Sequence, residues 1–382
     1  MHKILGIIKF FHLIFIDEGC KKRYQIALLQ YFWEDMSMNG RKKIIAGTLL
    51  TLLLAACSQE AEKPVATVSS NDSKATAEAP KEAPKATAED KLDSRFVTIA
   101  TGGASGPYNI IATTMGEIYS EKYKANSKTQ TTGASVENIN LIDQGKAEMA
   151  FVMSDALNQA INGEAPFQKK IDSVKQIAVL YPNFVQIVTS QKSGIKTIED
   201  LKGKRVAVGD QNSGVEVNAR SLLNGHGITY NDLKVDYLGY AEAADALRAG
   251  RIDAAFLTSG LPNASLMELA QGFDLQLVTI SPENIATIAQ DKPYFMAMEI
   301  PANTYGNAEA IPTAVIMNAL VVNSKLSDDD VYKLTKTFFE NLDRLQNSHQ
   351  AVKDVSFEQA QKGMVAPIHP GAQKYYDEQN KQ

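Results

Sequence analysis

From residue 96 onward, short runs of apolar and β-branched residues alternate with stretches in which apolar residues recur at helical spacing. This alternation predicts an α/β fold in which each strand is followed by a helix. The predicted strands cover residues 96–100, 129–132, 149–152, 205–208 and 254–257, and the predicted helices cover residues 110–123, 136–144, 215–223 and 328–346.

Each predicted strand ends in a loop that is rich in serine and glycine or polar residues and that opens a helix. Ligands of α/β sheets bind at the carboxyl ends of strands, and helix N-termini offer free N–H groups that suit anions. One such loop alone is more often a plain helix cap, but five together favour a binding site. The candidate ligand-binding residues are Ser105, Gly106, Tyr108, Ser135, Ser154, Asn212, Ser213, Gly214, Ser259 and Gly260.

Two residues near these loops allow a structural interpretation as well. Tyr108 lies on an amphipathic helix and could belong to the core. Arg220 lies nearly two turns past Gly214, where solvent exposure is favoured over a salt bridge to a ligand.

The chain contains an internal repeat, because residues 137–154 parallel residues 242–259 at a constant offset of 105. A period of this length is domain-sized and predicts two similar lobes that face one cleft. We expect the first lobe to comprise residues 96–185 and 285–382, and the second lobe residues 186–284. An apolar segment at 176–189 and a second candidate crossing near 277–285 would form a hinge between them.

The segment before the predicted fold has the pattern of a secretory signal. A cationic stretch leads into 13 apolar or small residues at 44–56, which are too few for a transmembrane helix of roughly 20 residues. Leu-Ala-Ala-Cys at 54–57 resembles a bacterial lipobox, which implies a signal peptide at 38–56 and lipidation of Cys57. Residues 57–95 read as a disordered tether, and residues 1–37 as an extension before the true start.

Composition narrows the possible functions further. The 382 residues carry a net charge of −5, which becomes −9 once the eight Lys and Arg and four Asp and Glu of residues 1–56 are removed. This balance does not favour nucleic-acid binding. The two cysteines, Cys20 and Cys57, do not form a disulfide framework or a metal site, and no catalytic motif is recognisable. We expect no metal, no cofactor and no enzymatic activity, and a monomer.

Over residues 96–382 the chain resembles the TAXI family, the receptors of one branch of tripartite ATP-independent periplasmic (TRAP) transporters. The markers are TGGASGPY at 101–108, GASVEN at 133–138, LTSGLP at 257–262, FFENL at 338–342 and HPGA at 369–372. The resemblance implies a two-lobed type II periplasmic-binding-protein (Venus flytrap) fold with a two-strand hinge. It also implies capture of a small carboxylate, such as glutamate, glutamine or 2-oxoglutarate, for an ion-coupled permease at the periplasmic face of a bacterial membrane. Family members commonly have another glycine and a Gly-Thr pair where this chain has Asp210-Gln211-Asn212.

Three other functions fit parts of the sequence. A receptor of an ATP-driven importer for a small organic anion would have the same fold, and neighbouring genes would distinguish it. A periplasmic enzyme on this fold is disfavoured by the missing catalytic groups. A sensor domain is disfavoured because no signalling segment is recognisable.

Overall fold

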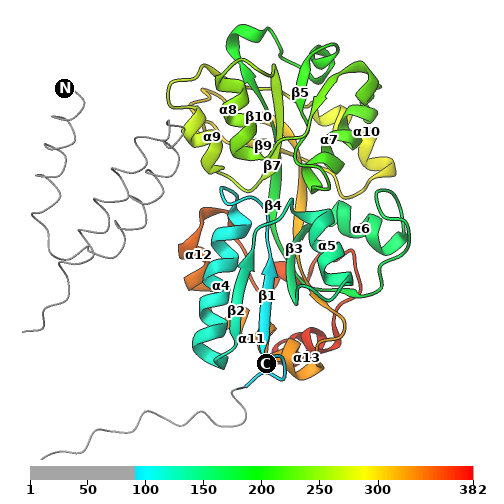
Figure 1. The fold of residues 1–382 in the computed structure, drawn as a ribbon, viewed down its shortest axis with the longest axis vertical. Coiled ribbons are helices and arrows are strands. Elements are labelled where there is room, and N and C mark those ends of the chain that lie inside the picture. Colours follow the sequence, from blue (N-terminus) through cyan, green and yellow to red (C-terminus); the bar gives the residue numbers. More distant parts are fainter. Residues whose placement is uncertain (1–90, 382) are drawn as a thin grey trace, which may run out of the picture. The chain divides into compact units, whose positions relative to one another are not determined.

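The computed structural model of this protein describes residues 91–381, which belong to one of two compact units of the chain, Glu82–Gln382. The predicted extension, the signal peptide, Cys57 and most of the tether lie outside these residues. Within the described part the expected α/β class is confirmed, because ten strands form one mixed sheet with helices on both faces (Figure 1).

Two long antiparallel strands form the centre of the sheet: β4 (Val174–Ser190) and β10 (Ile311–Asn323). The shorter strands are β1 (Phe96–Ala100), β2 (Asn126–Gln130), β3 (Met149–Met153), β5 (Arg205–Ala207), β6 (Lys234–Asp236), β7 (Ala254–Ser259), β8 (Leu275–Leu277) and β9 (Met296–Ile300). Their order is β2-β1-β3-β10-β4-β7-β5-β6, while β8 pairs with β4 and β9 with β10. Because both faces of the central strands are covered, β4 is buried almost throughout instead of alternating between buried and exposed residues.

The helices follow the strands much as the sequence predicts. They are α4 (Pro107–Tyr123), α5 (Ser135–Asp143), α6 (Ser154–Asn162), α7 (Gly214–Gly225), α8 (Tyr240–Arg248), α9 (Ala264–Leu269), α10 (Pro282–Asp291), α11 (Asp328–Glu340), α12 (Leu342–Ser348) and α13 (Pro370–Gln379). The helix α4 begins at Pro107, where the missing N–H removes no helical hydrogen bond. The predicted helix 328–346 is two helices, α11 and α12, which are separated at Asn341.

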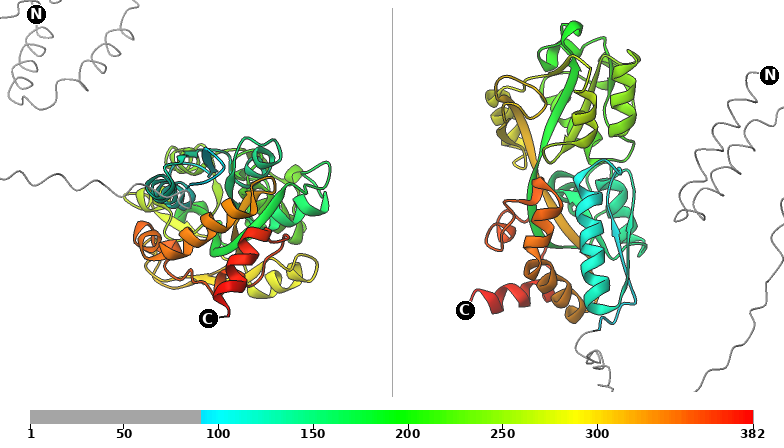
Figure 2. Two further views of the ribbon diagram at one scale, coloured as in Figure 1. Left: turned by 90° about the horizontal axis from the view of Figure 1, so that it is seen from below. Right: turned by 90° about the vertical axis from the view of Figure 1, so that its left-hand side faces the viewer.

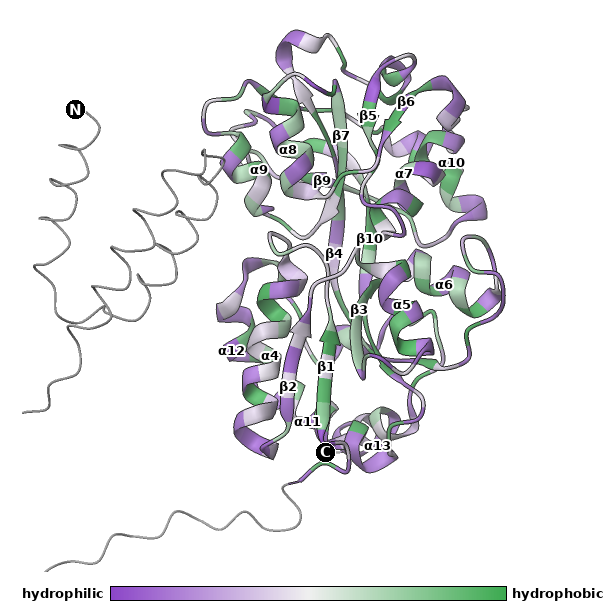
Figure 3. Ribbon diagram, in the orientation of Figure 1, coloured by the Kyte–Doolittle hydropathy of each residue, from purple (hydrophilic) through white to green (hydrophobic). Residues whose placement is uncertain are grey.

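Buried side chains divide these elements into two lobes, each with apolar clusters on both faces of its part of the sheet. The first lobe comprises β1–β3, α4–α6 and α11–α13, and the second lobe comprises β5–β9 and α7–α10. The strands β4 and β10 contribute to both. Figure 2 shows the helices on both sides of the sheet, and Figure 3 shows apolar strands such as β1 and β3 between them. The interiors include Tyr119 and Phe151 in the first lobe and Phe256 and Phe295 in the second.

The second crossing between the lobes differs from our expectation. Ile285 and Ile288 of α10 pack with Leu222 in the second lobe, and Ile300 at the end of β9 packs there too. The chain returns to the first lobe along β10 and not near residues 277–285. The reason is that β10 pairs with β4 over most of its length, so that the two crossings lie side by side as hydrogen-bonded strands.

The segment predicted as the end of the tether is fixed to the fold. The backbone N–H groups of Asp93 and Ser94 donate to the Asp330 carboxylate at 2.7 and 2.8 Å, at the start of α11. An acidic group at this position also favours the helix dipole. Among the helices of residues 91–381, none is both long and apolar enough to span a membrane.

Candidate functional site

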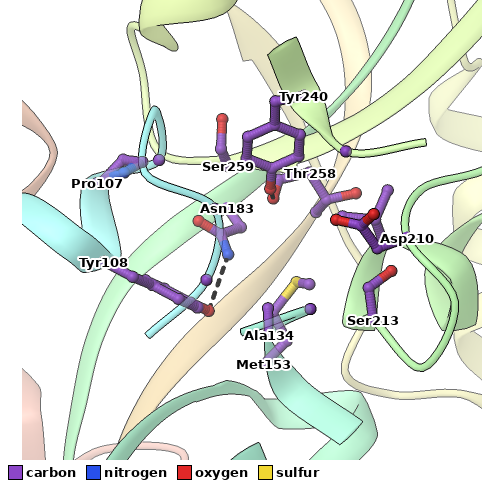
Figure 4. Close-up of a pocket in the computed structure, with 16 residues that line it drawn as sticks. Pro107, Tyr108, Ala134, Met153, Asn183, Asp210, Ser213, Tyr240, Thr258 and Ser259 are labelled. Carbon is purple, nitrogen blue, oxygen red and sulfur yellow. Dashed lines mark hydrogen bonds between the residues drawn. The ribbon is translucent and has the colours of Figure 1, made fainter. Parts of the chain in front are cut away.

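A small cavity lies where the two lobes meet, and both lobes line it (Figure 4). The centre of a water molecule can reach about 40 Å³ of its interior, which is room for a few waters or a small solute. The first lobe contributes the loop between β1 and α4 and the loop before α5. The second lobe contributes the loop after β5, the start of α8 and the end of β7.

Tyr108 forms part of the first-lobe wall. Its ring packs on Phe151, with centroids 5.0 Å apart, and its hydroxyl donates to the Asn318 side-chain oxygen. The Asn183 amide also donates to the Tyr108 hydroxyl at 3.3 Å. Burial raises the pKa of Tyr108 well above its ordinary value, so the phenol stays neutral. Tyr108 is therefore both a core residue and a wall of the cavity.

Two buried polar groups at the cavity lack partners. Asn183 of β4 donates from its amide nitrogen to Asn318 at 2.7 Å, but its side-chain oxygen has no hydrogen-bond partner among the described residues. The same is true of the Thr258 hydroxyl on β7. The exposed fractions of Asn183 and Thr258 are only 2% and 1%. Because unpaired buried polar groups are costly, both are candidates for contact with a ligand or an enclosed water.

The serines of the second-lobe wall are already engaged. Ser213 accepts from the Glu216 backbone N–H at 3.0 Å and so caps α7. The Ser259 hydroxyl accepts from the side-chain amides of Gln186 and Asn263 at 3.0 and 3.1 Å. As a cap, Ser213 retains its hydroxyl proton for a further partner. Ser259 also donates to the Gly260 carbonyl, at 3.2 Å, so its role is mainly structural.

Asp210 makes the electrostatics of the cavity negative. The residue follows β5 and lies against Gly239, where an added Cβ would sit 3.0 Å from a carboxylate oxygen. Burial, followed by the charges of Glu242 and Glu137, raises the pKa of Asp210. No lysine or arginine is among the described residues that line the cavity. Arg220 is exposed and pairs with Glu216 instead, so it does not compensate this charge.

The lobes touch around the cavity, so the structure is a closed form. The Glu137 backbone N–H of α5 donates to the Asn212 carbonyl at 3.2 Å, and the Asn218 side chain of α7 donates to the Asp155 carboxylate of α6. Asp155 is fully buried, and this burial raises its pKa to about 7. A side chain on Gly214 would collide with Met153 and Ser135 of the first lobe.

The sequence profile of the NMT1-like family matches residues 99–379 of the chain. The chain belongs to the NMT1-like family. Its mixed α/β sheet, with two strands shared between two lobes, has the two-lobed α/β architecture expected from the sequence.

Several solved structures are similar at low identity. The periplasmic aliphatic sulphonate binding protein SsuA from Escherichia coli is 14% identical over 74% of this chain and 82% of its own, with a TM-score of 0.41. The alkanesulfonate-binding protein SsuA from Xanthomonas axonopodis pv. citri bound to MOPS is 14% identical over 74% and 83%, with a TM-score of 0.44. A binding protein component of an ABC phosphonate transporter from Pseudomonas aeruginosa is 13% identical over 68% and 80%, with a TM-score of 0.45. Likeness at this level does not bear on the ligand of the NMT1-like protein.

The structure brings together some of the predicted site residues and separates others. Those that line the cavity are Gly106, Tyr108, Ser213 and Ser259. Those that lie outside its lining but pack within the fold are Ser135, Ser154, Gly214 and Gly260.

The remaining two predicted site residues also lie outside the cavity lining, at the surface and not within the fold. Ser105 is half-exposed in a turn closed by the Gly106 N–H and the Gly103 carbonyl. Asn212 is exposed and adopts a φ of 63°, and its carbonyl is engaged by the first lobe. Their side chains therefore do not take part in lining the site.

Sequence reasoning missed several lining residues, notably Asn183, Asp210, Tyr240 and Thr258. Asn183 was detectable in principle, because an amide in the middle of an apolar strand needs hydrogen-bond partners. Tyr240 begins α8, and its hydroxyl donates to the Thr258 carbonyl at 2.5 Å. No local signal places this helix start at the same cavity as the predicted loops.

Proposed function

We propose that this protein is an extracytoplasmic solute-binding protein that captures a small organic solute between its lobes and delivers it to a membrane permease. The observation that carries the proposal is the cavity, which both lobes line and which contacts between the lobes enclose. A solute that contacts both walls at once binds the closed form more tightly than the open form. Binding therefore shifts the equilibrium towards the closed form. The free energy of this shift cannot exceed the difference between the binding free energies of the two forms.

The two shared strands suit this mechanism. The strands β4 and β10 are the connections between lobes, and rotation about a few residues at their middle would open the cavity. The strand β10 shows irregular pairing with β4 between Met317 and Ala319, at the level of Asn318. Opening would then separate Met153 from the apolar cluster of the second lobe and Val217 from that of the first lobe, and would leave the rest of each cluster in place.

We propose further that the solute is a small carboxylate and that the partner is a TRAP-type ion-coupled permease. The resemblance of the loops at 101–108 and 257–262 to the TAXI family supports this assignment. Gly106 and Ser213 lie at helix starts that line the cavity, where backbone N–H groups could meet a carboxylate. Acylated Cys57 would hold the receptor at the periplasmic face of a bacterial membrane, as a monomer.

Native mass spectrometry of the protein purified from its host tests the solute-binding function. We expect a bound small molecule, released on denaturation, and the same compound should raise the melting temperature of ligand-free protein. Absence of any bound compound, together with no melting shift across organic acids and amino acids, would contradict the proposal. Cross-linking in the host tests the partner: we expect capture of a multi-span permease, and capture of a transporter with an ATPase subunit would contradict the TRAP assignment.

A further inference from the structure

The charge of the cavity constrains the chemistry of its solute. Asp210 contributes a carboxylate to the lining, and Glu137 and Glu242 are close enough to raise its pKa further. The lining residues among the described part of the chain include no basic side chain. A solute that brought only carboxylates would meet a like charge with no fixed cation to offset it.

The unpaired groups of the cavity are mainly hydrogen-bond acceptors. The Asn183 side-chain oxygen is buried and unpartnered, and the Asp210 carboxylate makes no side-chain hydrogen bond or ion pair within residues 91–381. The Thr258 hydroxyl, also unpartnered, can donate or accept. Figure 4 shows Asp210, Ser213 and Thr258 on one side of the cavity, with Asn183 between them and Tyr108. Because the cavity has more free hydrogen-bond acceptors than donors, it favours a solute that carries several hydrogen-bond donors.

The position of Asp210 also suits a negative charge. Its carboxylate lies beside Gly239, the N-cap of α8, and the positive end of a helix favours an anion there. Gly239 leaves room for this approach, since a Cβ would come within 3.0 Å of the carboxylate. A cation that entered the cavity would relieve the repulsion among Asp210, Glu137 and Glu242. It would pair with Asp210, which is the one of the three that lines the cavity.

We propose that Asp210 is a specificity-determining residue that selects solutes with a protonated amine, such as small α-amino acids, over carboxylates that lack one. This inference rests on the proposed solute-binding function. The ammonium group of the solute lies against the Asp210 carboxylate. The carboxylate of the solute accepts hydrogen bonds from the backbone N–H groups at the helix starts. Asn183 and Thr258 accept or exchange the remaining hydrogen bonds.

The test uses pairs of probes that differ only by an amine or a hydroxyl at the same carbon: L-alanine with L-lactate, L-serine with glycerate, and L-glutamate with 2-hydroxyglutarate. Calorimetric titration of the ligand-free protein should detect binding of the amine member of a pair, with the hydroxyl member at least about 10-fold weaker. Asp210→Asn should weaken the amine member by about 10- to 150-fold, the range for loss of a hydrogen bond to a charged group. It should leave the hydroxyl member unchanged or improved.

Glu242→Gln is the matched control, because it removes the same charge near the cavity from an exposed residue outside its lining. It should change affinity by less than about 3-fold, as screened surface charges do. Circular dichroism melts of both variants verify that they fold. Equal binding of hydroxyl and amine members, or an Asp210→Asn variant with unchanged affinity, would overturn the inference and leave the solute-binding function standing. Binding of no probe, and of no co-purified compound, would contradict both.

Discussion

Replacing Gly214 with alanine should hold the lobes apart. Gly214 is the first residue of α7 in the second lobe, and an added Cβ would lie 2.4 Å from the Met153 side chain and 2.6 Å from the Ser135 hydroxyl of the first lobe. Both neighbours belong to the opposite wall, so the collision exists only in the closed form. In the open form an alanine at a helix start is well tolerated.

The magnitude follows from the contacts. Overpacking of this kind costs about 1–3 kcal/mol, which corresponds to an affinity about 5- to 150-fold weaker if the collision opposes closure alone. Met153 can move at its tip, but Ser135 is held by the backbone N–H of Met153, which donates to its hydroxyl at 3.0 Å. We therefore expect a value above the lower limit. A larger residue, as in Gly214→Leu, should weaken binding further.

Calorimetric titration of the ligand-free variant with the solute that copurifies with the unmodified protein measures the affinity. Small-angle X-ray scattering at saturating solute measures the extent of closure. Gly116→Ala is the control, because Gly116 lies in α4 and away from the cavity. A Cβ there would make only an ordinary contact, 3.7 Å from the Ser127 side chain. The control should keep the affinity of the unmodified protein. A Gly214→Ala variant that binds equally tightly and closes to the same extent would refute the reasoning that closure brings α7 against Met153.

Two further predictions concern polar side chains and use three variants. Burial raises the pKa of Asp155 from 3.8 to about 7, against hydrogen bonds from the Ala156 backbone and the Asn218 side chain that lower it, so between these pH values the folded protein holds a proton that the unfolded chain has lost. The melting temperature should therefore fall as pH rises from about 4 to 7, and Asp155→Asn should flatten this dependence in a series of calorimetric melts; a slope unaffected by the substitution would contradict the assignment. Ser213→Ala should lower the free energy of unfolding by about 0.5–2 kcal/mol through loss of the α7 cap, whereas Ser105→Ala, in a half-exposed turn, should leave it unchanged. Denaturant unfolding measures both, and equal stabilities would argue against a capping role for Ser213.

The local structure was largely predictable from the sequence. The strand at 96–100 has the predicted bounds, and α5 and α7 begin within one residue of expectation. Their apolar periodicity is strong, and glycine or proline marks their ends. The second crossing was misplaced because residues 277–280 form a short apolar run like those of β10, and only the pairing partner distinguishes a strand that joins two lobes from one that stays in its own.

The site was predictable only in part, because it combines loops that are far apart in the chain. Gly106 and Ser213, which the pattern of serine and glycine at helix starts singles out, line the cavity. The same pattern could not show that Ser105 is half-exposed and outside the cavity lining, or that Asn212 adopts a left-handed conformation on the surface. Asp210 is adjacent in sequence to the predicted residues. Its proposed role in binding depends on Gly239, the N-cap of α8, and no local sequence pattern places Gly239 beside it.

A crystal structure of the protein with a tightly bound amino acid tests the central claim most directly. The account predicts that the solute lies in the cavity and contacts Tyr108 or the Gly106 turn on one side and Ser213 on the other. It also predicts the amine of the solute within hydrogen-bond distance of the Asp210 carboxylate. A solute held by a single lobe, or bound elsewhere on the molecule with the cavity empty, would contradict it.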